Sequence, residues 1–254
     1  FYLMLARNFG FKVNAEPFEL LAKHLALTIL LKHSSNLFQL EALLYGCAGF
    51  LNKSYKNKYP QQLQNEFEFL KNKYKLKELD VSLWKFLRLR PANFPTVRLW
   101  QFAQIIHKCS DIFRNPENFN SVEALSKAIS HKHEGYWRNH YKLDGPEVSV
   151  INGIGKNSIE NIIINTMAPF LFFYGQQTGK DKYIEAAVAC FEKLPFEDNV
   201  KTRNFTKASL KFSQRDAFGK NAGHSQGLIT LFDNYCKNTR CLDCGIASSL
   251  LLTK

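Results

Sequence analysis

Uninterrupted apolar stretches are short throughout this chain of 254 residues. A helix that spans a membrane needs about 18 to 20 consecutive apolar residues. The nearest approach, Ile162 to Tyr174, is interrupted by Asn165 and Pro169, so we expect a buried helix there and no membrane partner. Motifs that identify several enzyme classes are missing as well, because the sequence holds no P-loop, no His-Glu-x-x-His motif and no Ser-His-Asp spacing.

Acidic residues are outnumbered, with 22 Asp and Glu against 34 Lys and Arg, and the formal net charge is +12. A basic field favours anionic partners, nucleic acid above all. The alternative is an ordinary lysine-rich surface that keeps the protein in solution, because net charge alone specifies no partner.

Alternating strand patterns are also scarce, and helical spacing dominates the chain. Phe18, Leu21, Leu25 and Ile29, for example, recur every three or four residues. We therefore predict an all-α, multi-helix globular fold of about ten helices, either undivided or built from two packed helical halves. The predicted helices are 16–32, 36–51, 60–75, 97–106, 122–130, 157–174, 180–194, 200–210, 221–237 and 242–252.

A polar and aromatic segment, residues 131–146, is the best candidate boundary between halves. It would connect an N-terminal helical half, 1–130, to a C-terminal helical half, 147–254. Its histidines, His131, His133 and His140, could bind a metal or act as acid and base. The alternative is a solvated loop.

Cysteine is sparse, and Cys47, Cys109 and Cys190 stand alone in the sequence. This scatter does not resemble the dense disulfide framework of a small secreted protein. We therefore expect a cytoplasmic protein in a reducing compartment. Free cysteine is usually buried as a small apolar residue, and that is the simplest interpretation of these three.

Cys236, Cys241 and Cys244 form the one tight cluster of thiols, two of them as Cys-x-x-Cys. Thiolates bind zinc or an iron–sulfur cluster, and a two-residue spacer lets two sulfurs converge. A structural zinc site is usually four-coordinate, and Cys190 is the best fourth ligand because its helix could fold back against the last one. The alternatives are a redox pair, or thiols with no metal.

The segment from Arg88 to Arg98 joins three arginines to two prolines. Pro91 and Pro95 disfavour helix in the residues before them, while Arg88, Arg90 and Arg98 offer planar donors suited to phosphate. Aromatic residues that could stack on bases surround them, namely Trp84, Phe86, Phe94 and Trp100. In the alternative, the aromatic residues belong to the core and the arginines pair internally with Glu41, Glu66 or Asp80.

A glycine turn, Gly153-Ile-Gly155-Lys156, precedes a long apolar helix. It resembles the hairpin of helix-hairpin-helix DNA-binding motifs, in which backbone amides at a helix N-terminus bind phosphate. Lys156 would add positive charge. The alternative is a plain turn that enters a buried helix.

Several segments together resemble a bacterial family known as domain of unknown function 2851. They span nearly the whole chain and comprise residues 9–18, 41–50, 88–98, 165–170 and 241–244. The resemblance implies a longer protein whose N-terminal region is β-rich, acidic and similar to a nuclease core, with this chain as the helical C-terminal portion. The chain also begins with Phe1 rather than Met, so we expect a missing upstream segment to be one of its partners.

These observations favour a helical nucleic-acid-binding or accessory domain of a larger, nuclease-like protein. Arg88, Arg90 and Arg98 would contact phosphate, and the Gly153 to Lys156 turn would add an anion site. One alternative is a metal-dependent hydrolase with an open metal position at the cysteines or the histidines. The other is a protein-interaction scaffold, which would expose a large apolar patch.

Overall fold

The regular structure of the protein is helical. The computed structural model describes residues 1–254 except 116–120, 131–133, 152, 211–218 and 253–254. In the described residues, β pairing is limited to an isolated bridge between Pro195 and Asn221. The predicted all-α fold is therefore confirmed.

The first seven α-helices are α1 (Tyr2–Phe9), α2 (Ala15–His24), α3 (Leu27–Lys32), α4 (Leu37–Cys47), α5 (Lys58–Tyr74), α6 (Pro95–Lys108) and α7 (Val122–Ile129). The later ones are α8 (Lys156–Ile162), α9 (Ala168–Thr178), α10 (Asp181–Lys193), α11 (Val200–Leu210), α12 (Ala222–Leu231) and α13 (Gly245–Leu252). Two π-helical segments, η6 (Ile163–Met167) and η8 (Phe232–Cys236), continue α8 and α12.

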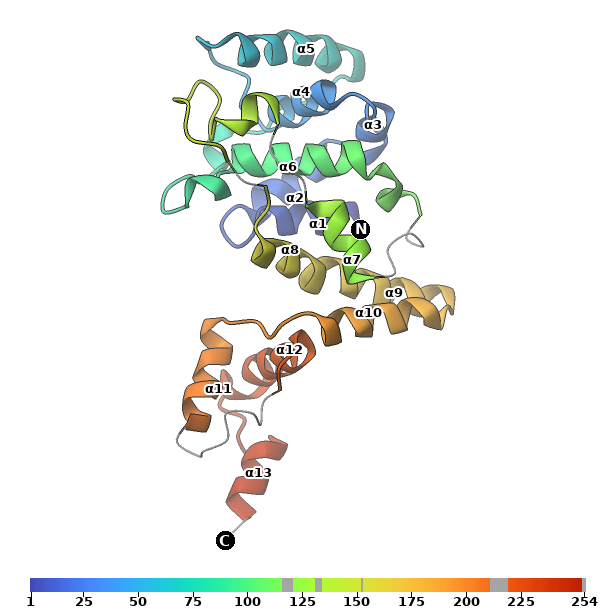
Figure 1. Ribbon diagram of the computed structural model, residues 1–254, viewed down its shortest axis with the longest axis vertical. Helices are drawn as coiled ribbons and strands as arrows, with labels where there is room; N and C mark the ends of the chain where they lie inside the picture. The colour runs from blue at the N-terminus through green and yellow to red at the C-terminus, as the bar shows by residue number, and fades with distance from the viewer. Residues whose placement is uncertain (116–120, 131–133, 152, 211–218, 253–254) are drawn as a thin grey trace.

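The helices are arranged in successive layers along the long axis of the molecule (Figure 1). Helices α5, α4 and α6 lie one below another at one end, and α8 to α10 lie beyond α1 and α2. Helices α11 to α13 form the opposite end, where the C-terminus lies. A single hydrophobic core includes residues from Tyr2 to Ala222, so it contains side chains from both predicted halves.

The helix predicted at 16–32 is two helices in the structure. Leu25 and Ala26 have extended backbone between α2 and α3. The carbonyl of Leu25 accepts a hydrogen bond from the Tyr2 hydroxyl at 2.9 Å. The Leu25 side chain is fully buried in the core. The break between the two helices therefore keeps this side chain inward, and the Tyr2 hydroxyl satisfies the Leu25 carbonyl that the break leaves without a helical partner. Helix α1 was not among the predicted helices.

Helix α4 is the centre of the N-terminal layers. It is apolar on every side, and its residues from Leu40 to Cys47 are all buried. A helix of this kind is stable only inside a protein, and α5 and α6 pack against it. A Cβ atom on Gly46 would lie 2.1 Å from the Phe67 ring, so glycine permits the close approach of α5.

Glu41 is the one charged residue of α4, and it is 3% exposed. Its carboxylate accepts hydrogen bonds from the Tyr59 hydroxyl of α5 and from Trp137 Nε1 at 2.8 Å. The Trp137 ring in turn stacks on Tyr45 with 5.1 Å between centroids. Burial raises the pKa of Glu41 to about 7, against the lowering effect of the two hydrogen bonds. This carboxylate ties α4, α5 and the segment around Trp137 together.

None of the helices in the described parts of the chain is long and apolar enough to cross a membrane.

The folded protein should lose stability as pH rises through the pKa of Glu41. The pKa is about 7 in the fold and 4.5 as the ordinary value, so burial favours the protonated form. That contribution is complete below pH 4.5 and is lost as pH passes 7, a change on the order of 3 kcal/mol. Denaturant unfolding of Glu41→Gln between pH 4 and 8 should show a flatter pH profile than the wild type.

Glu68→Gln is the matched control, because Glu68 is an exposed carboxylate on α5. It should retain the wild-type pH profile. Identical profiles for Glu41→Gln and the wild type would contradict the prediction.

Candidate nucleic-acid interface

The three arginines of the 88–98 segment do not share one environment. Arg88 and Arg90 are exposed, whereas Arg98 is 4% exposed and belongs to α6. No ion pair of Arg88 or Arg90 is found among the described residues. The structure therefore leaves two guanidinium groups on the surface and turns the third inward.

The loop that carries Arg88 and Arg90 is anchored at its base. Trp84 Nε1 donates to the Ala48 carbonyl at 2.8 Å. The side chain of Asn14 binds both the N–H and the carbonyl of Lys85, at 2.8 and 2.9 Å. The rings of Phe86 and Phe94 then meet with 5.1 Å between centroids, which closes the loop on either side of the two arginines.

Arg98 holds the far end of this loop against α8. Its Nη2 donates to Asn93 Oδ1 at 2.6 Å and to Ser158 Oγ at 3.2 Å. Its Nη1 donates to Gln101 Oε1 at 2.9 Å, and its guanidinium carbon lies 4.3 Å from the centre of the Phe11 ring. Burial lowers the pKa of Arg98 to about 10, so the group stays cationic at neutral pH.

The partners of Arg98 are amides, a hydroxyl and an aromatic ring, with no carboxylate among the described residues. The carboxylates considered as internal partners are engaged elsewhere. Glu41 binds Tyr59 and Trp137, Glu66 accepts from Gln39, and Asp80 accepts from the N–H of Ser82. With its donors directed inward, Arg98 positions the loop and does not present a phosphate contact at the surface.

A cleft of about 270 Å³ lies beside the arginine loop. Within the described part of the chain, its only charged lining residues are Lys53 and Lys142. Lys142 Nζ lies 5.4 Å from the centre of the Phe86 ring and 5.1 Å from that of Phe94. Lys53 Nζ lies 5.3 Å from the centre of the Tyr55 ring. The rest of the lining is Phe50, Asn52, Tyr55, Val81, Phe86, Thr96 and Leu143.

The two lysines come from loops that Asp144 joins. Its carboxylate accepts hydrogen bonds from the backbone N–H groups of Lys56 and Asn57, at 2.8 and 2.7 Å. These bonds lower the pKa of Asp144. Sequence reasoning missed Lys53 and Lys142, because no motif connects two lysines so far apart in the chain. The lysine-rich run from Lys53 to Lys58 was the one available signal.

The glycine turn lies at the start of α8. Ser158, two residues after Lys156, accepts the hydrogen bond from Arg98. Gly155 is the N-cap residue, with φ −66°, and a Cβ atom there would meet nothing within 4 Å. Gly153 is half-buried. The Lys156 side chain is 86% exposed and pairs with Glu160 at 3.8 Å. Lys156 lines a second cavity, separate from the cleft of Lys53 and Lys142.

The cysteines of the predicted metal site differ in exposure. Cys190 and Cys244 are buried, whereas Cys236 and Cys241 are exposed. Throughout the described ranges, no three His, Cys, Asp or Glu side chains are grouped so that they could hold a metal. Bound zinc or an iron–sulfur cluster stays a prediction, which elemental analysis of the purified protein would test.

The predicted histidine site falls partly on residues 131–133, which lie outside the described residues. His140 is described and is buried. Its ring stacks on Tyr136 with 3.8 Å between centroids, and its Nδ1 lies 2.9 Å from the Tyr136 carbonyl oxygen. His140 thus packs against its own loop.

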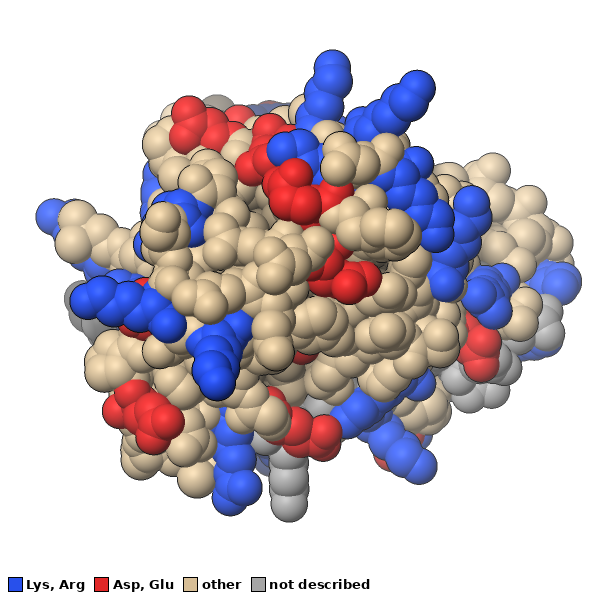
Figure 2. Space-filling model, turned by 90° about the horizontal axis from the view of Figure 1, so that it is seen from above, with Lys and Arg blue, Asp and Glu red and all other residues tan. Residues whose placement is uncertain are grey.

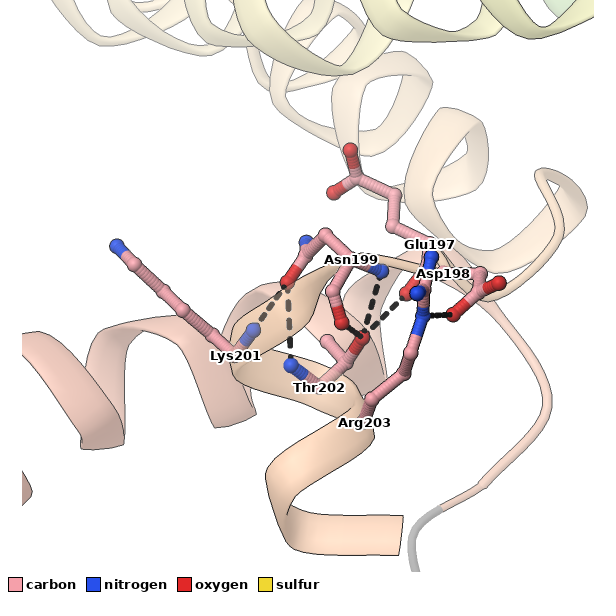
Figure 3. Close-up of polar contacts among 6 residues, drawn as sticks. All are labelled: Glu197, Asp198, Asn199, Lys201, Thr202 and Arg203. Carbon is pink, nitrogen blue, oxygen red and sulfur yellow. Dashed lines mark hydrogen bonds and ion pairs between the residues drawn. The ribbon is translucent and has the colours of Figure 1, made fainter.

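A further polar cluster joins α10 to α11 (Figure 3). Asn199 Oδ1 accepts from the N–H groups of Lys201 and Thr202, and Thr202 Oγ1 donates to the Glu197 carbonyl at 2.8 Å. Arg203 Nε donates to Asp198 at 2.6 Å. The Glu197 carboxylate points away from the others in Figure 3 and accepts from Gln226 of α12. These bonds are typical of a helix N-terminus and explain the cluster as structural.

Surface charge is mixed on the face at the α5 end. Figure 2 shows Lys and Arg side chains around the edge of that face, with acidic side chains gathered among them and uncharged surface between. The positive charge is therefore not one continuous field there. The local cleft, not the net charge, identifies the candidate interface.

One family model matches the chain. It is described as "Protein of unknown function (DUF2851)", and it covers residues 1–200, or everything from α1 to α10. The match therefore includes the arginine loop, the cleft and the glycine turn, and it ends before Cys236. A search of the curated proteins and a search of the solved structures found no match.

Alanine substitution should lower the stability of the protein at the buried Arg98 and not at the exposed Arg88. Arg98→Ala removes a buried side chain that donates to Asn93, Gln101 and Ser158, and we expect it to lower the free energy of unfolding by about 2 to 3 kcal/mol. Arg88→Ala removes no such contact and should stay within about 0.5 kcal/mol of the wild type. Urea unfolding of both variants measures the difference.

Arg98→Lys is the informative second variant. A single ammonium group cannot reproduce the planar fork, in which Nη1 reaches Gln101 while Nη2 reaches Asn93 and Ser158, so we expect it to recover only part of the stability lost in Arg98→Ala. Equal stabilities for Arg98→Ala and Arg88→Ala would rule out the positioning role of Arg98.

Proposed function

The chain belongs to the family of proteins of unknown function DUF2851, and from its geometry we propose that it is a helical nucleic-acid-binding domain. The interface would be the arginine loop together with the adjacent cleft. Arg88 and Arg90 would contact phosphates, and Lys53 and Lys142 would add two more cations. Arg98 would hold the loop in place from within.

One observation carries this proposal: among the described residues, the cleft beside the arginine loop is lined by two lysines and by no acidic residue. No other charged residue of the described structure lines it, and Arg88 and Arg90 follow Phe86 of the same cleft in the chain. Phosphate contacts from Lys and Arg supply most of the affinity of a protein for nucleic acid. A carboxylate in the cleft would have opposed them.

The aromatic residues favour single-stranded nucleic acid. Phe50, Tyr55 and Phe86 line the cleft. Phe86 is half-buried, and a base of a single strand can stack on such a ring whatever its sequence, whereas Phe50 and Tyr55 are each 7% exposed and belong to the core. A cleft with a volume of about 270 Å³ has room for one flat ring system and not for a duplex. Leu87, which is 83% exposed at the loop, could also contact an unpaired base.

The protein should bind a fluorescently labelled single-stranded oligonucleotide with an affinity that falls as salt rises. Arg88→Ala with Arg90→Ala removes two phosphate contacts, and each contact contributes about −0.7 to the slope of log K against log salt for single strands. Anisotropy titrations at 25 to 200 mM salt should therefore show weaker binding at low salt and a shallower slope. The duplex of the same sequence should bind less tightly.

Lys220→Ala with Lys237→Ala is the control for net charge. Both residues are exposed cations near α12, so the pair lowers the charge equally without touching the cleft. It should bind like the wild type. The proposal fails if the wild type shows no affinity at 25 mM salt, or if the two double variants weaken binding to the same degree.

A further inference from the structure

A second cavity lies where α7, the start of α8 and the end of α10 meet. Its volume is about 540 Å³, within the range of about 300 to 1,000 Å³ that is usual for small-molecule sites. It shares no lining residue with the cleft of Lys53 and Lys142. Its lining includes Lys156 of the glycine turn but no residue of the arginine loop.

The cavity combines apolar walls with a basic rim. Its apolar lining consists of Val122, Ile154, Ile159, Leu194 and Pro195. Its charged lining consists of Lys127, Lys156, Lys193 and Glu160, and two hydroxyls, from Ser126 and Ser130, complete it. A few polar groups around an apolar surface are characteristic of sites that orient a small ligand.

The lysines on the rim are available to a ligand. Lys127 has no ion pair in the described parts of the chain. Lys193 lies 3.6 Å from Glu123, and Lys156 lies 3.8 Å from Glu160. All three lysines are exposed. Surface ion pairs of this kind contribute little to stability, so an incoming anion can replace them.

We propose that this cavity binds a small amphipathic anion, a carboxylate or phosphate monoester on an apolar body. The anionic group would lie between Lys127 and Lys193 and accept hydrogen bonds from Ser126 or Ser130. The apolar body would cover Ile154 and Ile159. The lining carries three ammonium groups against one carboxylate, and this excess of positive charge selects an anion over a cation.

Calorimetric titration of the full chain tests the proposal with ligands that share one ring system. We expect 1-naphthyl phosphate or 1-naphthoate to bind, and whichever binds more tightly identifies the preferred anionic group. Neutral 1-naphthol, cationic 1-naphthylmethylammonium and inorganic phosphate should each bind at least about tenfold more weakly, because each lacks either the charge or the apolar body. Equal binding of any of the three, or no binding of either anion, would overturn the proposal.

Two pairs of variants locate the binding site. Lys127→Ala with Lys193→Ala should weaken binding of the naphthyl anion about tenfold or more, whereas Lys127→Arg with Lys193→Arg should retain it. Lys53→Ala with Lys142→Ala should leave it unchanged and should weaken oligonucleotide binding instead. An unchanged affinity of Lys127→Ala with Lys193→Ala for the naphthyl anion would refute the site. Thermal unfolding checks that each variant is folded.

Discussion

Helix α4 is apolar on every side, so other helices must surround it before it can be stable. Helices α5 and α6 pack against it, and Gly46 lets α5 come within contact of its backbone. The single carboxylate that this burial encloses, Glu41, is then satisfied by Tyr59 and Trp137. Because α4 must be covered, both α5 and the loop that contains Trp137 pack against it.

The candidate interface is a consequence of how the loops around this core are tied down. Asn14 binds the backbone of Lys85, and Asp144 binds the backbone of Lys56 and Asn57. Such bonds fix the loops without using the cationic side chains. The ammonium groups of Lys53 and Lys142 remain at the cleft, where they lie near aromatic rings.

Charge has two separate roles in this protein. The buried guanidinium of Arg98 has no carboxylate partner in the described structure, and it is held by amides, a hydroxyl and the Phe11 ring. Breaking contacts to a buried charge is costly, so Arg98 constrains where the loop and α8 can lie. The exposed Arg88 and Arg90 have no ion pair among the described residues, which is why a ligand-binding role is proposed for them.

Local sequence determined the helices and the interruptions between them. Periodic apolar residues predicted α4 to α13 with ends mostly within three residues of those observed, because helical spacing and helix-breaking residues act over a few positions. The extended backbone of Arg90 and Phe94, directly before Pro91 and Pro95, followed from the two prolines in the same way. The break at Leu25 and Ala26 did not, because a contact with Tyr2, distant in sequence, stabilises it.

Tertiary structure alone decided which cations meet. Arg88, Arg90 and Arg98 are alike in sequence, yet Arg98 lies inside because its turn of α6 faces Phe11 and α8. Lys53 and Lys142 line one cleft only because Asp144 joins their loops. The sequence determined where the helices form and that the chain is basic. The distribution of that charge between interior and surface depended on packing between distant segments, which no local pattern records.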